Sequence, residues 1–247
     1  MGLDELSASR ATVENDVAVR VFDVLAASIL LLLLLPLIVL ISVGIVVDSW
    51  GPVLYGCERV GRYGRSFRML KFRKMKVDAE GPPLTTGSDA RFTRFGRLLA
   101  KSKLDELPQL WNVVKGDMSL VGPRPEDASF VALLPADYEE ILQVPPGITG
   151  LSQLAFARES QLLAADDVHG YYVERLLPQK ISLDRLYAHR RSLLLNLQIL
   201  LWTTVVVSLV AEVAVNRRSG HLTFRRRSPQ TEPQGERTQL ASETSSR

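Results

Sequence analysis

The sequence has a single cysteine, Cys57, and only three histidines. One thiol cannot form an internal disulfide, so a disulfide-stabilised fold is excluded and a reducing, cytosol-facing environment is indicated. The histidines are scattered and lack the spacing of metal ligands, which argues against a histidine-based zinc site. No internal repeat occurs between residues 51 and 191, and the elements there are short and separated by glycine and proline.

What the sequence does contain is a long apolar run, from Val24 to Val47, with no charged residue over 24 positions. A continuous helix of this length would measure about 36 Å, against about 30 Å for the hydrocarbon core of a bilayer. The run is too long for a secretory signal peptide, and no small-residue cleavage site follows it. We therefore expect one domain attached to a membrane segment rather than a purely soluble globule.

Pro36 divides this run at its midpoint, where it removes a backbone donor and predicts a break. Arg10 and Arg20 precede the run. Eight basic residues and no acid follow between positions 59 and 76, namely Arg59, Arg62, Arg65, Arg68, Lys71, Arg73, Lys74 and Lys76. Because both flanks favour the cytoplasmic side, we expect residues 20–50 to enter the membrane, turn near Pro36 and return. A kinked helix that spans the membrane is the alternative, since prolines are common in spanning helices.

A second apolar stretch, residues 192–211, holds no charge but includes Asn196, Gln198 and Trp202. A helix that lies in the membrane interface explains this polar content better than a second span, so we expect a membrane-associated helix over 192–215. Residues 1–19 are expected to form an N-terminal cytosolic segment. Residues 216–247 are expected to be a disordered polar tail.

The central region shows one clear helix after Asp105. Its apolar positions follow the i, i+3, i+4, i+7 pattern, at Leu107, Leu110, Trp111 and Val114. Lys115 and Gly116 supply the expected ending, and Pro108 falls in the first turn, where its missing donor costs little. Residues 53–55 and 67–72 are predicted to be strands, and residues 94–100 a helical turn.

Asp105 is thereby placed at or beside the helix N-cap, with Glu106 in the first turn. The free backbone donors and the dipole at that end favour anions, so they suit an ionised Asp105 and attract a substrate phosphate. Adjacent carboxylates can divide two tasks, one attacking phosphorus while the other binds Mg²⁺. An acidic cap followed by an acidic first turn is also ordinary helix design, which leaves a structural role open.

The following segment, residues 116–126, places glycine and proline on both sides of Arg124. A guanidinium held rigidly in this way suits bidentate binding of phosphate. An exposed turn with a solvated Arg124 is the alternative. Upstream, Arg59 and Arg73 could reach the same site, whereas lipid headgroups are the expected partners of most neighbouring basic residues.

The string KLDELPQLWNVVKGDMSLVGPRPE, residues 103–126, resembles the signature of the bacterial sugar transferases, which are monotopic polyprenyl-phosphate phosphoglycosyl transferases. Other motifs of that family follow in the same order. They are ERVG at 58, KFR at 71, DARFT at 89, PPGITGLSQ at 145 and YVERLLPQKISLDRLYAHRRS at 172. The resemblance extends over about residues 20–204.

The resemblance implies an α/β enzyme with a small single catalytic domain, residues 51–191, on the re-entrant helix and accompanied by interfacial amphipathic helices. It places the enzyme on the cytosolic face of the inner membrane. Asp105 corresponds to the nucleophile, and Glu106 to the second catalytic carboxylate and Mg²⁺ ligand. The residues that correspond to substrate-phosphate contacts are Arg124, Arg59, Arg73 and Arg91. The implied partners are a UDP-sugar, polyprenyl phosphate and membrane lipid, with Mg²⁺ as cofactor.

The implied reaction transfers sugar 1-phosphate from the UDP-sugar to polyprenyl (undecaprenyl) phosphate through a covalent aspartyl intermediate and releases UMP. It is the initiating step of exopolysaccharide, capsule or O-antigen synthesis. Since one substrate is anchored in lipid, Asp105 is expected at an accessible position near the headgroups. A catalytically silent membrane scaffold for polysaccharide assembly is the alternative, disfavoured by the retained carboxylate pair. Nucleic-acid binding is not expected because no stacking-aromatic motif is present.

The chain departs from the family's usual Gln, Arg, Ser and Asp at Cys57, Ala100, Lys103 and Asn196. The missing arginine at position 100 weakens the expected phosphate contact, because a lysine does not reproduce a guanidinium fork. Only 23 residues precede Val24, so a short form without additional N-terminal spans is expected. The sequence leaves open which sugar is transferred, for which loops such as 156–169 are expected to matter. The pathway and any homo-oligomer also stay open.

Overall fold

The computed structural model describes residues 3–79, 81, 89–157, 168–209, 213–216 and 220–224. Its helices are α1 (Leu3–Leu33), α2 (Leu35–Asp48), α3 (Arg94–Ser102), α4 (Gln109–Lys115), α5 (Ala128–Leu133), α6 (Pro135–Ile141), α7 (Leu151–Ala155), α9 (Val168–Tyr171), α10 (Leu177–Arg190) and α11 (Leu193–Leu209). Short helical segments are η1 (Arg62–Gly64), η2 (Leu104–Glu106) and the π-helical η3 (Tyr172–Leu176). The strands are β1 (Leu54–Val60), β2 (Ser66–Phe72), β3 (Ser119–Val121), β4 (Gly147–Thr149), β5 (Val213–Val215) and β6 (Leu222–Phe224). The structure is therefore mixed helix and strand, and each sheet within the described residues has two strands.

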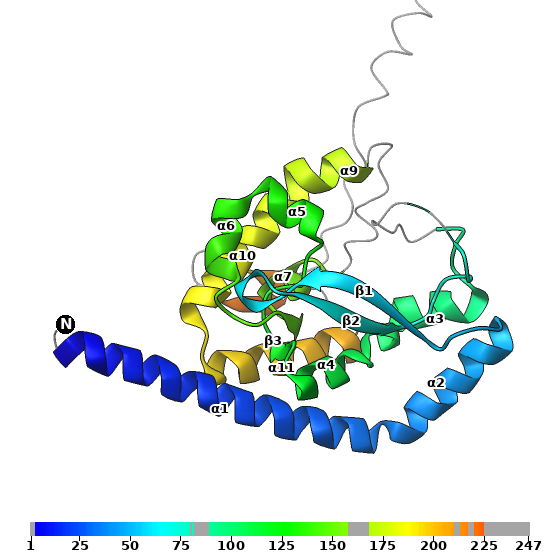
Figure 1. Ribbon diagram of the computed structural model, residues 1–247, viewed down its shortest axis with the longest axis horizontal. Helices are drawn as coiled ribbons and strands as arrows, with labels where there is room; N and C mark the ends of the chain where they lie inside the picture. The colour runs from blue at the N-terminus through cyan, green and yellow to red at the C-terminus, as the bar shows by residue number, and fades with distance from the viewer. Residues whose placement is uncertain are drawn as a thin grey trace, which may run out of the picture.

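Helices α1 and α2 form a bent apolar pair along the base of the molecule (Figure 1). The two axes meet at 61°, at a break between Leu33 and Leu35. Pro36 lies in the first turn of α2, where its missing donor costs little. Within the described residues no single helix has the length and hydropathy of a membrane span, whereas this pair together has both. The break predicted near Pro36 is confirmed, and α1 continues through the expected boundary at residue 20.

The bent pair has a buried side and an exposed apolar side. Val19 and Ile41 are buried against the rest of the protein. Leu32, Leu40 and Val47, by contrast, are large apolar side chains with 73%, 67% and 82% of their surface exposed. Large apolar side chains exposed along both helices are typical of a contact with lipid or with another protein.

Arg20 fastens α1 to the end of α4. Its guanidinium donates to the carbonyl oxygens of Val113 at 2.6 Å and Val114 at 2.9 Å. One turn further along, the Asp23 carboxylate accepts from the Ser119 hydroxyl at 2.6 Å. A cation on the last carbonyls of a helix satisfies groups that have no partner within that helix. The bent pair is thereby joined to the segment that carries residues 105–126.

The strand and turn predictions for the first half of the chain are confirmed, with longer elements than expected. β1 and β2 form an antiparallel hairpin in which Leu54 pairs with Phe72 and Val60 with Ser66. The helical turn predicted at 94–100 is α3. β3 and β4 pair in parallel next to a very close approach of two loops, since a Cβ on Gly147 would lie 2.0 Å from the Gly122 nitrogen.

Asn196 and Thr203 join helix α11 to the body, which corrects our explanation for this part of its polar content, whereas Gln198 is exposed. The Tyr187 hydroxyl lies 2.8 Å from Asn196 Oδ1, and the hydroxyls of Thr149 and Thr203 lie 2.7 Å apart. These groups therefore bond to the protein interior rather than to water at a membrane surface. Leu194 and other apolar side chains on the opposite side are exposed. Placement of α11 in the membrane interface stays a prediction.

The expectation of a disordered tail over residues 216–247 is wrong for residues 222–224, which form β6. β6 pairs antiparallel with β5, with Ala214 opposite Thr223, and Leu222 is buried. The alternation of apolar and polar residues over 221–224 suits a short strand with one buried side chain. Residues 225–247 and most of the loop at 156–169 lie outside the described residues.

Candidate active site

Asp105 and Glu106 lie in η2, a short turn between α3 and α4. Lys103, just before it, has a left-handed backbone with φ of 60°, an arrangement that costs a side-chain-bearing residue about 1 kcal/mol. Pro108 has no N–H to donate to the Leu104 carbonyl, so α4 begins only at Gln109. The expectation that Asp105 caps this helix is therefore wrong.

The Asp105 carboxylate is buried and paired with a lysine. Only 2% of its side chain is exposed, and Oδ2 accepts a hydrogen bond from Nζ of Lys74 at 2.8 Å. The same ammonium lies 5.8 Å from the centroid of the Phe92 ring, a contact that favours a cation. Asp105 is thus less accessible than expected. A substrate phosphate can reach it only if covering side chains shift.

The Glu106 carboxylate faces two other cations. Its Oε1 lies 3.1 Å from Nζ of Lys71 and 3.9 Å from Nη1 of Arg124. Burial raises the pKa of Glu106, but the charges of Lys71, Arg124 and Lys103 outweigh it and lower the pKa to about 2. Glu106 is therefore ionised at neutral pH, which is the state required of a metal ligand.

Arg124 lies on a loop whose backbone is fastened on both sides. Pro123 accepts from the Gly147 nitrogen at 2.8 Å, and Glu126 accepts from the Val60 nitrogen at 3.1 Å. These bonds hold the loop against β1 and the start of β4. They provide the rigid presentation of the guanidinium that the glycine and proline pattern predicts.

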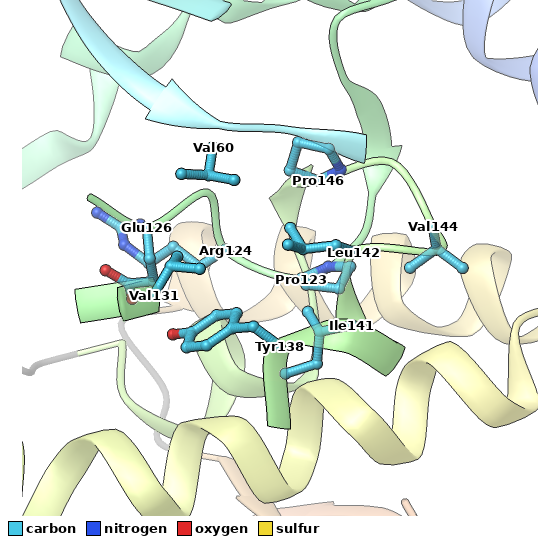
Figure 2. A pocket seen from close by; sticks show the side chains of 10 residues that line it. All are labelled: Val60, Pro123, Arg124, Glu126, Val131, Tyr138, Ile141, Leu142, Val144 and Pro146. Atoms are coloured by element: carbon cyan, nitrogen blue, oxygen red, sulfur yellow. The ribbon is translucent and has the colours of Figure 1, made fainter. Parts of the chain in front are cut away.

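A small pocket lies behind this loop (Figure 2). Apolar side chains such as Val60 and Pro146 line most of it, and the polar ends of Arg124, Glu126 and Tyr138 point to one side. The pocket therefore offers a polar edge beside an apolar wall.

Behind the loop, Glu126 is held by a buried lysine and a buried tyrosine. Nζ of Lys180 lies 3.0 Å from Glu126 Oε1 and 2.8 Å from the Tyr172 hydroxyl, which itself lies 3.0 Å from Glu126 Oε1. Burial raises the pKa of Glu126, but the Lys180 and Arg124 charges lower it below its ordinary value. This closed set of contacts fixes the residue two positions after Arg124.

Among the predicted phosphate contacts, the structure brings only Arg124 next to the carboxylate pair. The other three arginines bind other groups of the protein. Arg59 pairs with Asp127 at 2.7 Å, and Arg91 pairs with Asp89 at 2.6 Å. Arg73 donates to the carbonyl oxygens of Ser49 and Trp50. A contact between any of these three and a substrate stays a prediction.

Three residues near the carboxylates were missed as members of the site. Lys71 and Lys74 were assigned to lipid headgroups with the rest of the basic stretch. Asn112 is almost fully buried and joins α4 to β2, since its Oδ1 accepts from the Leu70 nitrogen at 3.0 Å and its Nδ2 donates to the Arg68 carbonyl at 2.9 Å. This joint places residues 71–74 opposite residues 105–106.

The two carboxylates can supply oxygen ligands to Mg²⁺. They are too few to hold a metal ion without water or substrate oxygens. In the described ranges there is no group of three or more Asp, Glu, His or Cys side chains that could hold a metal. Mg²⁺ commonly takes one or two protein carboxylates, several waters and substrate phosphate oxygens. Asp105 and Glu106 meet this minimum.

Buried Asp105 and partly buried Glu106 thus lie among lysine and arginine side chains, which are the groups that bind phosphate oxygens. Residues 14–210 match the family model described as Bacterial sugar transferase. The chain belongs to this family of phosphoglycosyl transferases.

Named relatives cover much of the chain. A Caulobacter vibrioides protein named UDP-glucose:undecaprenyl-phosphate glucose-1-phosphate transferase is 39% identical over 194 residues, which are 76% of this chain and 68% of that protein. Komagataeibacter xylinus has an undecaprenyl-phosphate glucose phosphotransferase that is 39% identical over 74% of this chain and 34% of its own length. An undecaprenyl-phosphate galactose phosphotransferase of Salmonella typhimurium is 37% identical over 55% of this chain and 32% of its own length. The chain thus spans about a third of the last two relatives.

Proposed function

We propose that this protein transfers sugar 1-phosphate from a UDP-sugar to undecaprenyl phosphate, with release of UMP. The names of the relatives support the general reaction. The observation that carries the proposal is the carboxylate pair, buried Asp105 and partly buried Glu106, in contact with Lys74, Lys71 and Arg124. The relatives' names differ in the sugar, so the donor sugar stays open.

In the proposed reaction a carboxylate oxygen of Asp105 attacks the phosphorus next to the sugar. The bond from this phosphorus to the bridging oxygen breaks, and UMP leaves with the electron pair. An oxygen of undecaprenyl phosphate then attacks the same phosphorus, and the aspartate leaves as a carboxylate. Arg124 and Lys71 offset the charge of the diphosphate, which would otherwise repel an anionic nucleophile.

Glu106 is the residue we propose to hold Mg²⁺, together with oxygens of the substrate phosphates. When bound, the cation would polarise the phosphoryl oxygens. The low pKa of Glu106 keeps its carboxylate free of a proton for this role.

We further propose that α1 and α2 insert as a re-entrant pair at the cytosolic face of the inner membrane. The 61° bend, the exposed apolar side of the pair and its basic flanks support this arrangement. It would bring the body to the surface where a lipid-anchored phosphate lies. The product, a polyprenyl-diphospho-sugar, suits the initiating step of exopolysaccharide, capsule or O-antigen synthesis.

The test is release of UMP from a panel of UDP-sugars, with and without undecaprenyl phosphate, by the wild type in detergent or nanodiscs. Asp105→Asn should lower turnover by about 10³-fold or more, because it removes the nucleophile. Asp137→Asn, a surface carboxylate on α6 that pairs with Arg185, is the matched control and should behave as wild type.

Mass measurement of the peptide carrying Asp105 should detect the sugar-phosphate adduct and identify the donor. Equal turnover by wild type and Asp105→Asn would overturn the assigned nucleophile. A wild type that releases UMP from no UDP-sugar would favour the scaffold alternative.

A further inference from the structure

Lys74 makes the closest contact to the proposed nucleophile, at 2.8 Å from Asp105 Oδ2. It lies two residues after the end of β2 and 31 positions before Asp105 in the sequence. A quarter of its side chain is exposed, while the carboxylate beneath it is buried. The contact is therefore an ion pair at the edge of the protein interior, where charge interactions are stronger than in water.

The neighbouring cations have other partners, so Lys74 is distinct among them. Lys71 pairs with Glu106 at 3.1 Å, and Arg124 lies 3.9 Å from the same carboxylate. Lys74 is the cation for which an ion pair with Asp105 is observed among the described residues. Lys71 and Arg124 are therefore placed to offset the charge of the substrate. Lys74 is placed to offset the charge of Asp105.

We infer that Lys74 is a catalytic residue that stabilises Asp105 as the leaving group in the second half of the reaction. This role rests on the proposed function, because it requires the aspartyl intermediate. In that intermediate one carboxylate oxygen is bonded to phosphorus and the other is a carbonyl oxygen. The Lys74 ammonium donates to the carbonyl oxygen, in the position it now takes at Oδ2.

Charge returns to Asp105 when the second substrate reacts. An oxygen of the lipid phosphate forms a bond to phosphorus, the bond from phosphorus to the aspartate oxygen breaks, and its electron pair spreads over both carboxylate oxygens. A hydrogen bond from an ammonium strengthens as its acceptor gains charge. The Lys74 contact is therefore stronger in the transition state than in the intermediate, which is the condition for catalysis.

In the first half of the reaction the hydrogen bond from Lys74 to Asp105 weakens, because the carboxylate loses charge as it attacks. Removal of the ammonium should consequently slow the second step more than the first. This asymmetry separates leaving-group stabilisation from a general loss of structure, which would slow both steps.

The experiment compares wild type, Lys74→Met and Lys74→Gln in single-turnover and steady-state assays. Without undecaprenyl phosphate, Lys74→Met should still release close to one UMP per enzyme. With undecaprenyl phosphate its steady-state turnover should fall by about 10²-fold, the typical effect of losing one charge-stabilising donor. The adduct on Asp105 should accumulate and be visible by intact mass. Lys74→Gln keeps a hydrogen-bond donor without charge. Its steady-state turnover should lie between those of wild type and Lys74→Met.

Lys115→Met is the matched control, since 60% of this lysine side chain is exposed and its ammonium pairs with Asp117 rather than with Asp105 or Glu106. This variant should keep the wild-type ratio between the UMP released in the first turnover (the burst) and the steady-state turnover. If Lys74→Met does not fold, as judged by thermal unfolding, the same ratio measured on Lys74→Gln decides. An unchanged ratio in the folded variant would overturn the role of Lys74 alone. A wild type without burst or adduct would overturn the proposed function, and this inference with it.

Discussion

The ammonium of Lys180 lies 3.0 Å from Oε1 of Glu126, and both side chains are buried. The pair joins α10 to the loop that carries Arg124. Removing one member of a buried ion pair leaves the other charge without compensation, at a typical cost of about 3 to 5 kcal/mol. The arginine loop is therefore fixed from a distant part of the sequence.

We predict that Lys180→Met lowers the free energy of unfolding by about 3 kcal/mol, because Glu126 loses the cation that contacts it directly. Denaturant unfolding in detergent measures this. The double variant Lys180→Met with Glu126→Gln should be more stable than Lys180→Met alone, since position 126 then carries no charge. A double variant that is less stable by the sum of the single effects would contradict the pairing.

Asp184 provides a prediction about pH. Its Oδ1 has no hydrogen-bond partner among the described residues, and burial raises its pKa to about 7, although Ser152 and Lys180 partly offset this effect. In the unfolded chain the pKa of an aspartate is about 3.9. The folded state therefore binds the proton more tightly, so this group makes stability fall as pH rises from about 4 to 7 and adds no further loss above that range.

Asp184→Asn should remove this contribution. At pH 8 its melting temperature should exceed that of wild type by about 5 °C, and near pH 4 the two should agree. Scanning calorimetry at several pH values measures the difference. A lower melting temperature for Asp184→Asn at pH 8 would show that the ionised carboxylate is favourable.

Arg20 gives a prediction about how the bent pair is attached. Arg20→Met removes two hydrogen bonds to the last carbonyls of α4, at Val113 and Val114, and should cost about 2 kcal/mol of stability. Arg20→Lys should recover only part, because an ammonium lacks the fork that reaches both carbonyls. Protease sensitivity of α1 and thermal unfolding measure the effect, with the exposed Arg65→Met as control. Equal stability of Arg20→Met and wild type would contradict the assignment.

Local features of the fold were predictable because they depend on neighbouring residues. Pro36 breaks the apolar run because a proline in a helix interior removes a hydrogen bond and clashes with the preceding turn, so a new helix begins there. Gly116 adopts a left-handed backbone with φ of 102° at the end of α4, as its position after the last apolar residues predicts. The Asp105 and Glu106 assignment came from the motif, and the structure adds their charged neighbours.

The features of the fold and site that the sequence did not predict depend on contacts between distant segments. The apolar pattern predicts Trp111 as a core residue, yet its side chain is 56% exposed, while the adjacent Asn112 is buried. α4 is rotated because Asn112 satisfies two backbone groups of β2, which a hydropathy pattern does not detect. The partner of Lys74 follows from the same docking of α4 against β2, so its role was hidden in a run of basic residues.

The re-entrant arrangement predicts that both ends of the chain lie on one side of the membrane. In a Cys57→Ser background, single cysteines introduced at Gly2 and at Arg247 should react with an impermeant maleimide only from the cytosolic side. Leu34→Cys, at the break between α1 and α2, should be protected from both sides, because the bend would lie within the apolar layer. Trp50→Cys, just after α2, is the exposed control and should react from the cytosolic side. Reaction of position 2 from the opposite side would replace the re-entrant pair with a kinked spanning helix, and free reaction of position 34 would show that the pair lies outside the bilayer.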